Sequence, residues 1–197
     1  MSRIFYIMGK SASGKDSIYK KLIEDPQLGL RGVVMYSTRP MRAGEVDGKD
    51  YFFITREQLE ALGLEGRIIE QRTYNTVYGP WTYATVDDGQ IDLTAGDYLM
   101  VGVLSAFVGM KEYFGEGAVV PVYIEVEDGE RLLRAIRREQ SGTPKYAEMC
   151  RRFLTDSEDF SEEKLAAAGI DRRYENTDFD SCVDEIRQMI MSMRDGR

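Results

Sequence analysis

The sequence predicts an α/β fold in which a parallel sheet is flanked by helices, and two kinds of segment support this prediction. Short apolar runs typical of buried strands lie at residues 4–8, 33–36, 98–104 and 119–124. Segments with helical spacing of apolar residues follow the first and last of these runs, at residues 18–23 and 130–139. Strands that alternate with helices are typical of a parallel sheet, and 197 residues suffice for one domain.

The composition excludes several classes of function. The net charge of −8 argues against a protein that coats nucleic acid or an anionic membrane. The chain has no histidine, which removes histidine-based proton transfer, Ser-His triads and histidine-bound metals. Cys150 and Cys182 show no metal-site spacing, so we expect reduced, buried thiols. With no membrane-spanning run and no signal-peptide pattern, we expect a cytoplasmic protein without nucleic-acid or membrane partners.

A glycine-rich segment directly follows the first predicted strand and precedes the first predicted helix. It reads GKSASGKDS over residues 9–17 and contains the pattern G-x-x-x-x-G-K. In this context the backbone N–H groups can surround a nucleotide phosphate, and a lysine charge can reach the outer phosphates. The expected phosphate-binding residues are Gly9, Ser11, Ala12, Ser13, Gly14, Lys15, Asp16 and Ser17.

The residue after the lysine departs from the usual pattern. A serine or threonine hydroxyl normally holds Mg²⁺ there, and this chain has Asp16, with Ser17 beside it. A carboxylate is also a hard oxygen ligand for Mg²⁺, directly or through water. We therefore expect Mg²⁺ to bind together with the nucleotide, with Asp16 as its candidate ligand.

The loop at residues 37–53 carries a second candidate site. Arg39 and Arg42 lie three residues apart beside Pro40 and Gly44, which excludes a place in the core. A solvated basic loop is one interpretation, and an anion clamp is the other, because arginine forks match phosphate oxygens.

The spacing S-T-R-x-x-R-x-G-E-x-x-G-x-x-Y, downstream of a phosphate loop, resembles the acceptor segment of guanylate kinases. The resemblance implies that Ser37, Arg39, Arg42, Glu45 and Tyr51 surround the phosphate of GMP. A glutamate that accepts hydrogen bonds from guanine and a later Tyr-Gly pair match Glu70, Tyr78 and Gly79.

The resemblance extends to the C-terminal half. Arg131, Arg134 and Arg138 share one side of the helix predicted at residues 130–139, with Leu132, Leu133 and Ile136 opposite. Guanylate kinases place two lid arginines four residues apart in this helix, which matches Arg134 and Arg138. A further family arginine corresponds to Arg151 or Arg152, and Arg152 is favoured because Phe153 follows it. The family asparagine that contacts adenine matches Asn176.

Other expectations concern single residues of these segments. Pro121 should be the first residue of its strand, because a central strand needs every N–H. The helix after the break at residues 141–144 should bury Tyr146, Met149, Cys150 and Phe153.

Three departures from the family pattern affect the guanine side. Met35 stands where the family has a serine, and Pro80 stands where it has a serine or threonine. The run at residues 98–104 has no aspartate, although the family strand ends in aspartates that hold guanine and organise metal-bound water.

The sequence therefore predicts a nucleoside monophosphate kinase with a phosphate-binding loop, ATP and Mg²⁺ as cosubstrates, and GMP as acceptor. Its expected parts are a core of residues 1–36 and 87–197, an acceptor-binding insert at 37–86 and a helical lid near 139–150. Lys15, Arg39, Arg134, Arg138 and Arg152 are the expected catalytic residues. The alternatives are a kinase of this fold with another phosphorylated acceptor, or a non-catalytic guanylate-kinase-like binding domain. A switch GTPase is disfavoured because N-K-x-D is absent.

Overall fold

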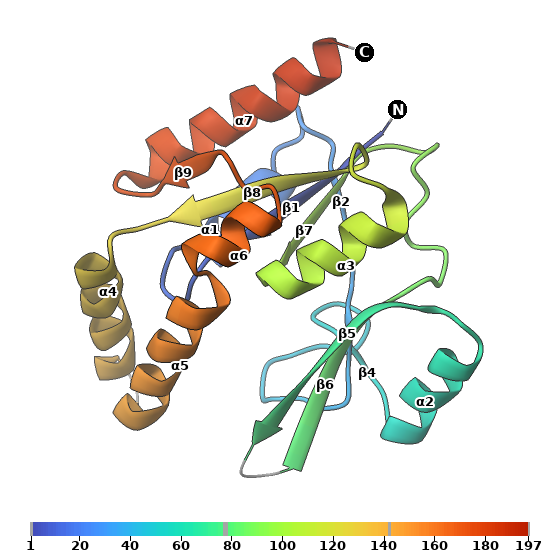
Figure 1. The fold of residues 1–197 in the computed structure, drawn as a ribbon, viewed down its shortest axis with the longest axis horizontal. Coiled ribbons are helices and arrows are strands. Elements are labelled where there is room, and N and C mark those ends of the chain that lie inside the picture. The colour runs from blue at the N-terminus through green and yellow to red at the C-terminus, as the bar shows by residue number, and fades with distance from the viewer. Residues whose placement is uncertain (1, 77–78, 142, 197) are drawn as a thin grey trace.

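A parallel sheet forms the centre of the computed structural model, which describes residues 2–76, 79–141 and 143–196 (Figure 1). In these residues the sheet has five strands in the order β2-β7-β1-β8-β9. The strands are β1 (Ile4–Met8), β2 (Arg31–Gly32), β7 (Tyr98–Gly102), β8 (Val119–Glu125) and β9 (Arg173–Glu175). All of their pairings are parallel, which confirms the predicted fold class.

Helices cover both faces of this sheet. Phe5 and Ile7 of β1 point to one apolar cluster, which includes residues of α1 (Lys15–Ile23) and α7 (Phe179–Asp195). Their neighbours Tyr6 and Met8 point to the other cluster, with α3 (Leu104–Phe114) and α6 (Glu162–Ala167). This alternation explains why the strands are apolar at every position. Within the described ranges, no helix has the length and apolar character needed to cross a membrane.

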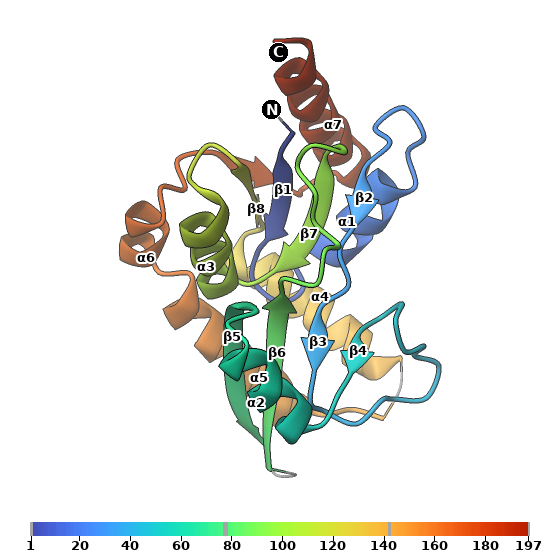
Figure 2. The ribbon, with the colours of Figure 1, turned by 90° about the vertical axis from the view of Figure 1, so that its right-hand side faces the viewer.

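A second, smaller sheet lies beside the first (Figure 2). Its strand order is β4-β3-β6-β5, and it contains β3 (Tyr36–Ser37), β4 (Phe52–Phe53), β5 (Ile68–Thr76) and β6 (Gly79–Val86). The helix α2 (Arg56–Leu64) packs on it through Leu59, and its first turn is closed by a capping box between Thr55 and Gln58. These strands come from the predicted insert, whose role in acceptor binding stays a prediction.

Two helices extend away from the main sheet below the ends of β8 and β1 (Figure 1). They are α4 (Asp128–Gln140) and α5 (Tyr146–Asp159), and they pack against each other. The predicted lid at residues 139–150 includes the end of α4, the connection between the two helices and the start of α5; residue 142 lies outside the described residues. Its function as a lid stays a prediction.

The strand predicted at residues 33–36 is wrong in most of its length. Only Tyr36 is in a strand, and residues 33–35 connect β2 of the main sheet to β3 of the small sheet. The Gln90 side chain satisfies the backbone here, since the N–H of Val34 donates to Gln90 Oε1 and Gln90 Nε2 donates to the Val34 carbonyl. A glutamine side chain thus replaces a neighbouring strand, and no local pattern reveals that.

The predicted place of Pro121 is also wrong, because it is the third residue of β8. The N–H and C=O groups of the even-numbered residues of β8 point to β1, since the Ile4 N–H donates to the carbonyl of Ala118, just before β8. Pro121 is an odd-numbered residue, so its backbone nitrogen points to the side of β9, and β9 pairs with β8 only from Tyr123 onward. The missing N–H thus has no ladder partner to lose.

The predicted faces of α4 and α5 need correction. In α4, Arg131 is buried with 1% exposure while Leu133 is 49% exposed. In α5, Met149 is buried, but Tyr146 and Cys150 are exposed. Cys182 is buried as expected, and burial raises the pKa of its thiol to about 11. Because α4 and α5 pack on each other, apolar spacing alone does not identify their covered sides.

The contact between β7 and β1 gives a test of this packing. A Cβ atom on Gly102 would overlap the Tyr6 hydroxyl and lie 2.9 Å from Tyr6 Cζ. We predict that Gly102→Ala lowers the free energy of unfolding by about 1–3 kcal/mol, as overpacking of a core does. Urea unfolding would measure the loss. It should shrink in a Tyr6→Phe background, because phenylalanine lacks the overlapping hydroxyl; an equal loss in both backgrounds would contradict the packing.

Candidate functional site

The glycine-rich loop joins β1 to α1 at the carboxyl edge of the main sheet, where ligands bind in open α/β sheets. Gly14 has φ of 89° and caps α1, and Ala12 has φ of 64°, the one positive φ outside glycine among the described residues. At Gly9 a Cβ atom would lie 2.6 Å from the Ile124 carbonyl oxygen. The loop is therefore a close-packed turn with a strained residue, as is common at functional sites.

Lys15, Asp16 and Ser17 form the first turn of α1, as the motif predicts. Lys15 Nζ lies 3.2 Å from Asp16 Oδ2, and the Asp16 side chain is 80% exposed. The buried side chain of Asn176, just after β9, donates from Nδ2 to the Ser13 carbonyl at 2.8 Å. Asn176 therefore supports the loop from β9, in addition to any contact with a ligand.

Charged side chains of α4 and α5 hold Ser11 of the loop. The Ser11 N–H donates to Asp156 Oδ2 at 2.7 Å, and Arg152 Nη2 donates to Ser11 Oγ at 3.0 Å. Arg131 Nη1 lies 3.4 Å from the Ser11 carbonyl oxygen and 3.7 Å from Asp156. The Asp156 carboxylate thus occupies an N–H of the loop, the kind of group that binds phosphate oxygens.

The other arginines of these helices are paired with acidic neighbours or backbone. Arg134 donates to Glu130 Oε1 and to the Asn176 carbonyl, both at 2.9 Å. Arg138 is half exposed and lies 3.9 Å from Glu139. Arg151 is held by Glu148, whereas Arg152 reaches the loop. The structure thus brings Arg152 to Ser11 and Arg134 to Asn176, and the catalytic role of Arg152 stays a prediction.

The predicted anion clamp forms a compact cluster on the small sheet. The expectation that Arg39 lies outside the buried interior is wrong: it is 4% exposed, because Glu45 balances its charge and the Tyr51 and Phe53 rings cover it. Arg39 donates to both Glu45 oxygens, at 2.7 and 2.5 Å. These hydrogen bonds lower the pKa of Glu45 to about 2. The Arg39 guanidinium lies 5.0 Å from the Tyr51 ring centre, and the Ser37 hydroxyl accepts from the Arg39 N–H. Arg42 is exposed, and its backbone N–H also donates to Glu45.

Charged groups of both the arginine cluster and the loop act on the Tyr51 hydroxyl. Burial is the main cause that raises the pKa of Tyr51, and Asp16 of the loop adds to it. Arg39 and Arg72 act in the opposite direction on the same hydroxyl. The Tyr51 hydroxyl is therefore within electrostatic range of the arginines of the small sheet and of Asp16 in the loop.

Glu70 is buried on β5, and it has two partners that sequence reasoning missed. Arg72 Nη1 donates to both of its oxygens, at 2.9 and 3.0 Å, and Thr85 Oγ1 donates to Oε1 at 2.7 Å. Residues two apart on a strand share one face, so the spacing of Glu70 and Arg72 could have indicated the pair. Gly79 begins β6 with φ of 101°, and Tyr78 lies outside the described residues.

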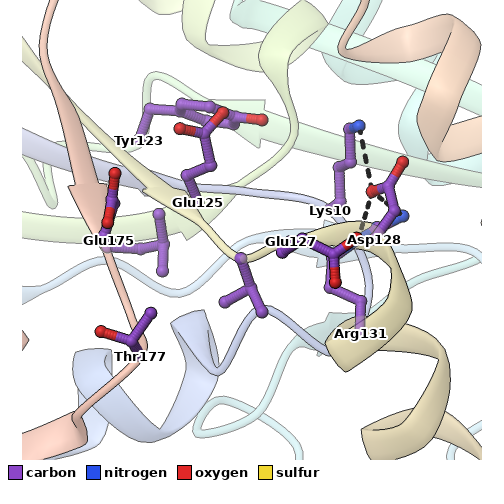
Figure 3. Close-up of a pocket in the computed structure, with 10 residues that line it drawn as sticks. Lys10, Tyr123, Glu125, Glu127, Asp128, Arg131, Glu175 and Thr177 are labelled. Carbon is purple, nitrogen blue, oxygen red and sulfur yellow. Dashed lines mark hydrogen bonds and ion pairs between the residues drawn. The ribbon is translucent and has the colours of Figure 1, made fainter.

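A pocket of about 380 Å³ adjoins the loop at Lys10, where β8, β9 and α4 meet (Figure 3). Its lining includes Glu125, Glu127, Asp128 and Glu175. Lys10 and Arg131 both point to Asp128, at 3.5 and 3.0 Å. Because carboxylates dominate the lining and neutralise its cations, this pocket is unsuited to a phosphate chain.

The described residues offer few side chains that could bind a metal ion together. In the described ranges no cluster of three or more Cys, Asp or Glu side chains could hold a metal ion. Asp16, exposed at the start of α1, fits the way Mg²⁺ is bound with nucleotides, through one or two carboxylates together with phosphates and water.

The fold and the loop define the class first: an α/β protein with a phosphate-binding loop and a small insert sheet. Residues 1–88 match the family model described as guanylate kinase. A guanylate kinase of Oceanobacillus iheyensis is 35% identical over 121 residues, which cover 59% of this chain and 55% of that protein. The match thus spans about half the length of this curated relative.

The fold comparison extends over nearly the whole chain. A crystal structure of guanylate kinase from Anaplasma phagocytophilum superposes with a TM-score of 0.69 at 21% identity, covering 98% of this chain and 86% of that one. The sequence match at residues 1–88 and this fold are consistent with each other: the N-terminal part of the chain is similar to guanylate kinases in sequence, and the whole chain shares the fold of this crystal structure.

The buried Arg131 gives a stability test for the contact between α4, α5 and the loop. We predict that Arg131→Ala lowers the free energy of unfolding by about 2 kcal/mol, less than for a fully buried pair because Asp128 is 49% exposed. Urea unfolding would measure this. The control is Arg137→Ala, an exposed arginine of the same helix, which should change stability by under about 0.5 kcal/mol. Equal losses in the two variants would contradict the role of Arg131.

Proposed function

We propose that the protein transfers the γ-phosphate of ATP to GMP, giving ADP and GDP. The observation that carries this proposal is the presence of two anion sites in one fold: the glycine-rich loop at residues 9–17 that enters α1, and the buried Arg39 that Glu45 and Tyr51 orient on the small sheet. The match of residues 1–88 to the guanylate kinase model and the 35% identity to a guanylate kinase over 121 residues support it. Phosphoryl transfer between nucleotides needs charge neutralisation and alignment rather than covalent chemistry, so a chain without histidine can perform it.

On the donor side, the loop would bind the β- and γ-phosphates of ATP. The N–H groups at the start of α1 and the charge of Lys15 would contact their oxygens. The Ser11 N–H would become available when Asp156 moves away from it, since the Asp156 carboxylate now accepts that hydrogen bond. Arg134, Arg138 and Arg152 would then neutralise the transferring group from α4 and α5.

On the acceptor side, Arg39 and Arg42 would bind the phosphate of GMP, with Tyr51 and Tyr78 as further ligands. Arg39 is already oriented by Glu45 and by stacking on Tyr51. A guanidinium held in one geometry loses less conformational entropy on binding than a free side chain does. Ser37 and Glu45 would thus act by positioning Arg39, and Gly79 by shaping the strand start next to Tyr78.

Asp16 would hold Mg²⁺, directly or through water, next to the phosphates. When bound, Mg²⁺ supplies positive charge to the β- and γ-phosphate oxygens. An oxygen of the GMP phosphate attacks the γ-phosphorus, and the bond from that phosphorus to the bridging oxygen of ADP breaks. The attacking oxygen is already anionic, so no side chain has to remove a proton.

The role of Lys15 can be tested directly. We predict that Lys15→Met lowers kcat by at least about 100-fold, because the charge that stabilises the transferring phosphate is lost. Calorimetry should find GMP binding largely unchanged. Lys20→Met, an exposed lysine of the same helix, is the matched control and should keep full turnover. Near-normal turnover of Lys15→Met would refute this assignment.

An acceptor panel separates the proposal from its alternatives. ADP release with ATP and Mg²⁺ should be strong with GMP and dGMP and weak with AMP, CMP, UMP and sugar phosphates. Turnover confined to another phosphorylated acceptor would replace GMP but keep the mechanism. Nucleotide binding without turnover on any acceptor would favour a binding domain, against which the retained Lys15 and glycines argue.

A further inference from the structure

Arg72 of β5 is a largely buried arginine that pairs with Glu70. Glu70 and Arg72 face the same side of β5, and their partners on β6 are Thr85 and Tyr83. The Tyr83 ring lies 5.7 Å from the Arg72 guanidinium and 5.7 Å from the Tyr51 ring, centre to centre. Arg72 therefore lies on the same wall as the phosphate cluster, between that cluster and Glu70.

Glu70 is fixed in place before any ligand binds. On its backbone side, Gly109 of α3 packs so closely that a Cβ atom there would lie 2.7 Å from Glu70 Cβ. Glu70 Oε1 accepts from both Thr85 and Arg72, whereas Oε2, among the described residues, accepts only from Arg72, at 3.0 Å. A carboxylate oxygen has two lone pairs, so Oε2 keeps one acceptor position for a ligand.

Arg72 has donor capacity beyond the Glu70 pair. Both bonds to Glu70 come from Nη1, while Nη2 contacts the Met35 thioether at 3.7 Å, a weak acceptor. Arg72 also forms a hydrogen bond with the Tyr74 hydroxyl. This bond lowers the pKa of Tyr74, but burial has the larger effect and raises it. Burial disfavours the charge on Arg72, but Glu70 together with Tyr6 and Tyr74 outweighs burial and raises the pKa of Arg72, so it stays a cation.

The pair thus offers a donor next to an acceptor and has no net charge. Its side chains are only 14% and 6% exposed. A ligand with a second phosphate would find no net positive charge here, whereas a neutral ring edge with a carbonyl next to an N–H would match both groups. The six-membered ring of guanine presents this edge with O6 and N1–H, and adenine presents the reverse polarity.

We propose that Arg72 is a specificity-determining residue that donates a hydrogen bond to O6 of a 6-oxopurine nucleoside monophosphate, while Glu70 Oε2 accepts from N1–H. This rests on the proposed function. Arg72 supplies a donor next to Met35, whose thioether has none to offer. Among the described residues, neither Glu70 Oε1, which already accepts two hydrogen bonds, nor β7, which carries no carboxylate, offers a comparable acceptor to the exocyclic amino group of guanine. IMP should therefore be an acceptor of similar quality to GMP.

The test measures kcat/KM for GMP, IMP and AMP in the ADP-release assay. The wild-type protein should have kcat/KM values for GMP and IMP within about 10-fold of each other, because the 2-amino group that distinguishes them is not bound. Its kcat/KM for AMP should be at least about 100-fold lower. Arg72→Met should lower kcat/KM for GMP and IMP together by about 10-fold or more, with KM for ATP unchanged. Arg67→Met, an exposed arginine beside β5, is the control and should leave all values unchanged.

Arg72→Lys covers the case in which Arg72→Met fails to fold, because it keeps a cation beside Glu70 and loses the Nη2 donor. It should also lower both values for GMP and IMP. A preference for GMP over IMP above about 100-fold, or unchanged turnover of GMP and IMP in the folded Arg72 variants, would overturn the inference.

Failure of the proposed function itself would look different, with no ADP formed by the wild-type protein on any acceptor. In that case calorimetric binding of GMP, IMP and AMP to the wild-type and Arg72→Lys proteins still decides about Arg72. Similar GMP and IMP affinities that fall together in Arg72→Lys support it, and unchanged affinities overturn it. Turnover of a non-purine acceptor alone would keep phosphoryl transfer and refute the role of Arg72.

Discussion

The site depends on arginines that are held close together by carboxylates. A site for two phosphorylated ligands needs several cations within a small volume, and these repel one another when no ligand is bound. In this protein Arg39 is paired with Glu45, Arg72 with Glu70, and Arg134 with Glu130. Each pair leaves the guanidinium oriented and its charge balanced. This pairing reconciles a net charge of −8 with a site for anions.

The same principle links the helices α4 and α5 to the loop. Asp156 holds the Ser11 N–H and lies 3.7 Å from Arg131, and the Arg131 guanidinium stacks on Phe153 at 4.6 Å. A carboxylate thus stands where a phosphate oxygen is expected, and a buried arginine stands beside it. Nucleotide binding and the arrangement of α4 and α5 are coupled in the proposed mechanism, because both act on Ser11.

The sequence predicted the parts of the fold that depend on local patterns. Apolar runs predicted β1, β7 and β8, and the glycine-rich motif predicted a loop that enters α1 at Lys15. It failed where distant side chains replace backbone partners, as Gln90 does for Val34, and where strand lengths differ, as at Pro121. The predicted clustering of Ser37, Arg39, Glu45 and Tyr51 agrees with the structure, although their roles stay predictions. The covered side of α4 could not be predicted, because an arginine is buried on it: Arg131 is held by hydrogen bonds to Asp128 and Ser11 and stacks on Phe153 of α5.

The measurement that tests the account most directly is the fate of a labelled γ-phosphate. The protein is incubated with ATP labelled at the γ-position, Mg²⁺ and GMP, and the labelled products are separated by chromatography. The account predicts label in the β-phosphate of GDP, with ADP formed in equal amount and little free phosphate. Label that stays in ATP, or that appears only as inorganic phosphate regardless of GMP, would contradict phosphoryl transfer between the two anion sites.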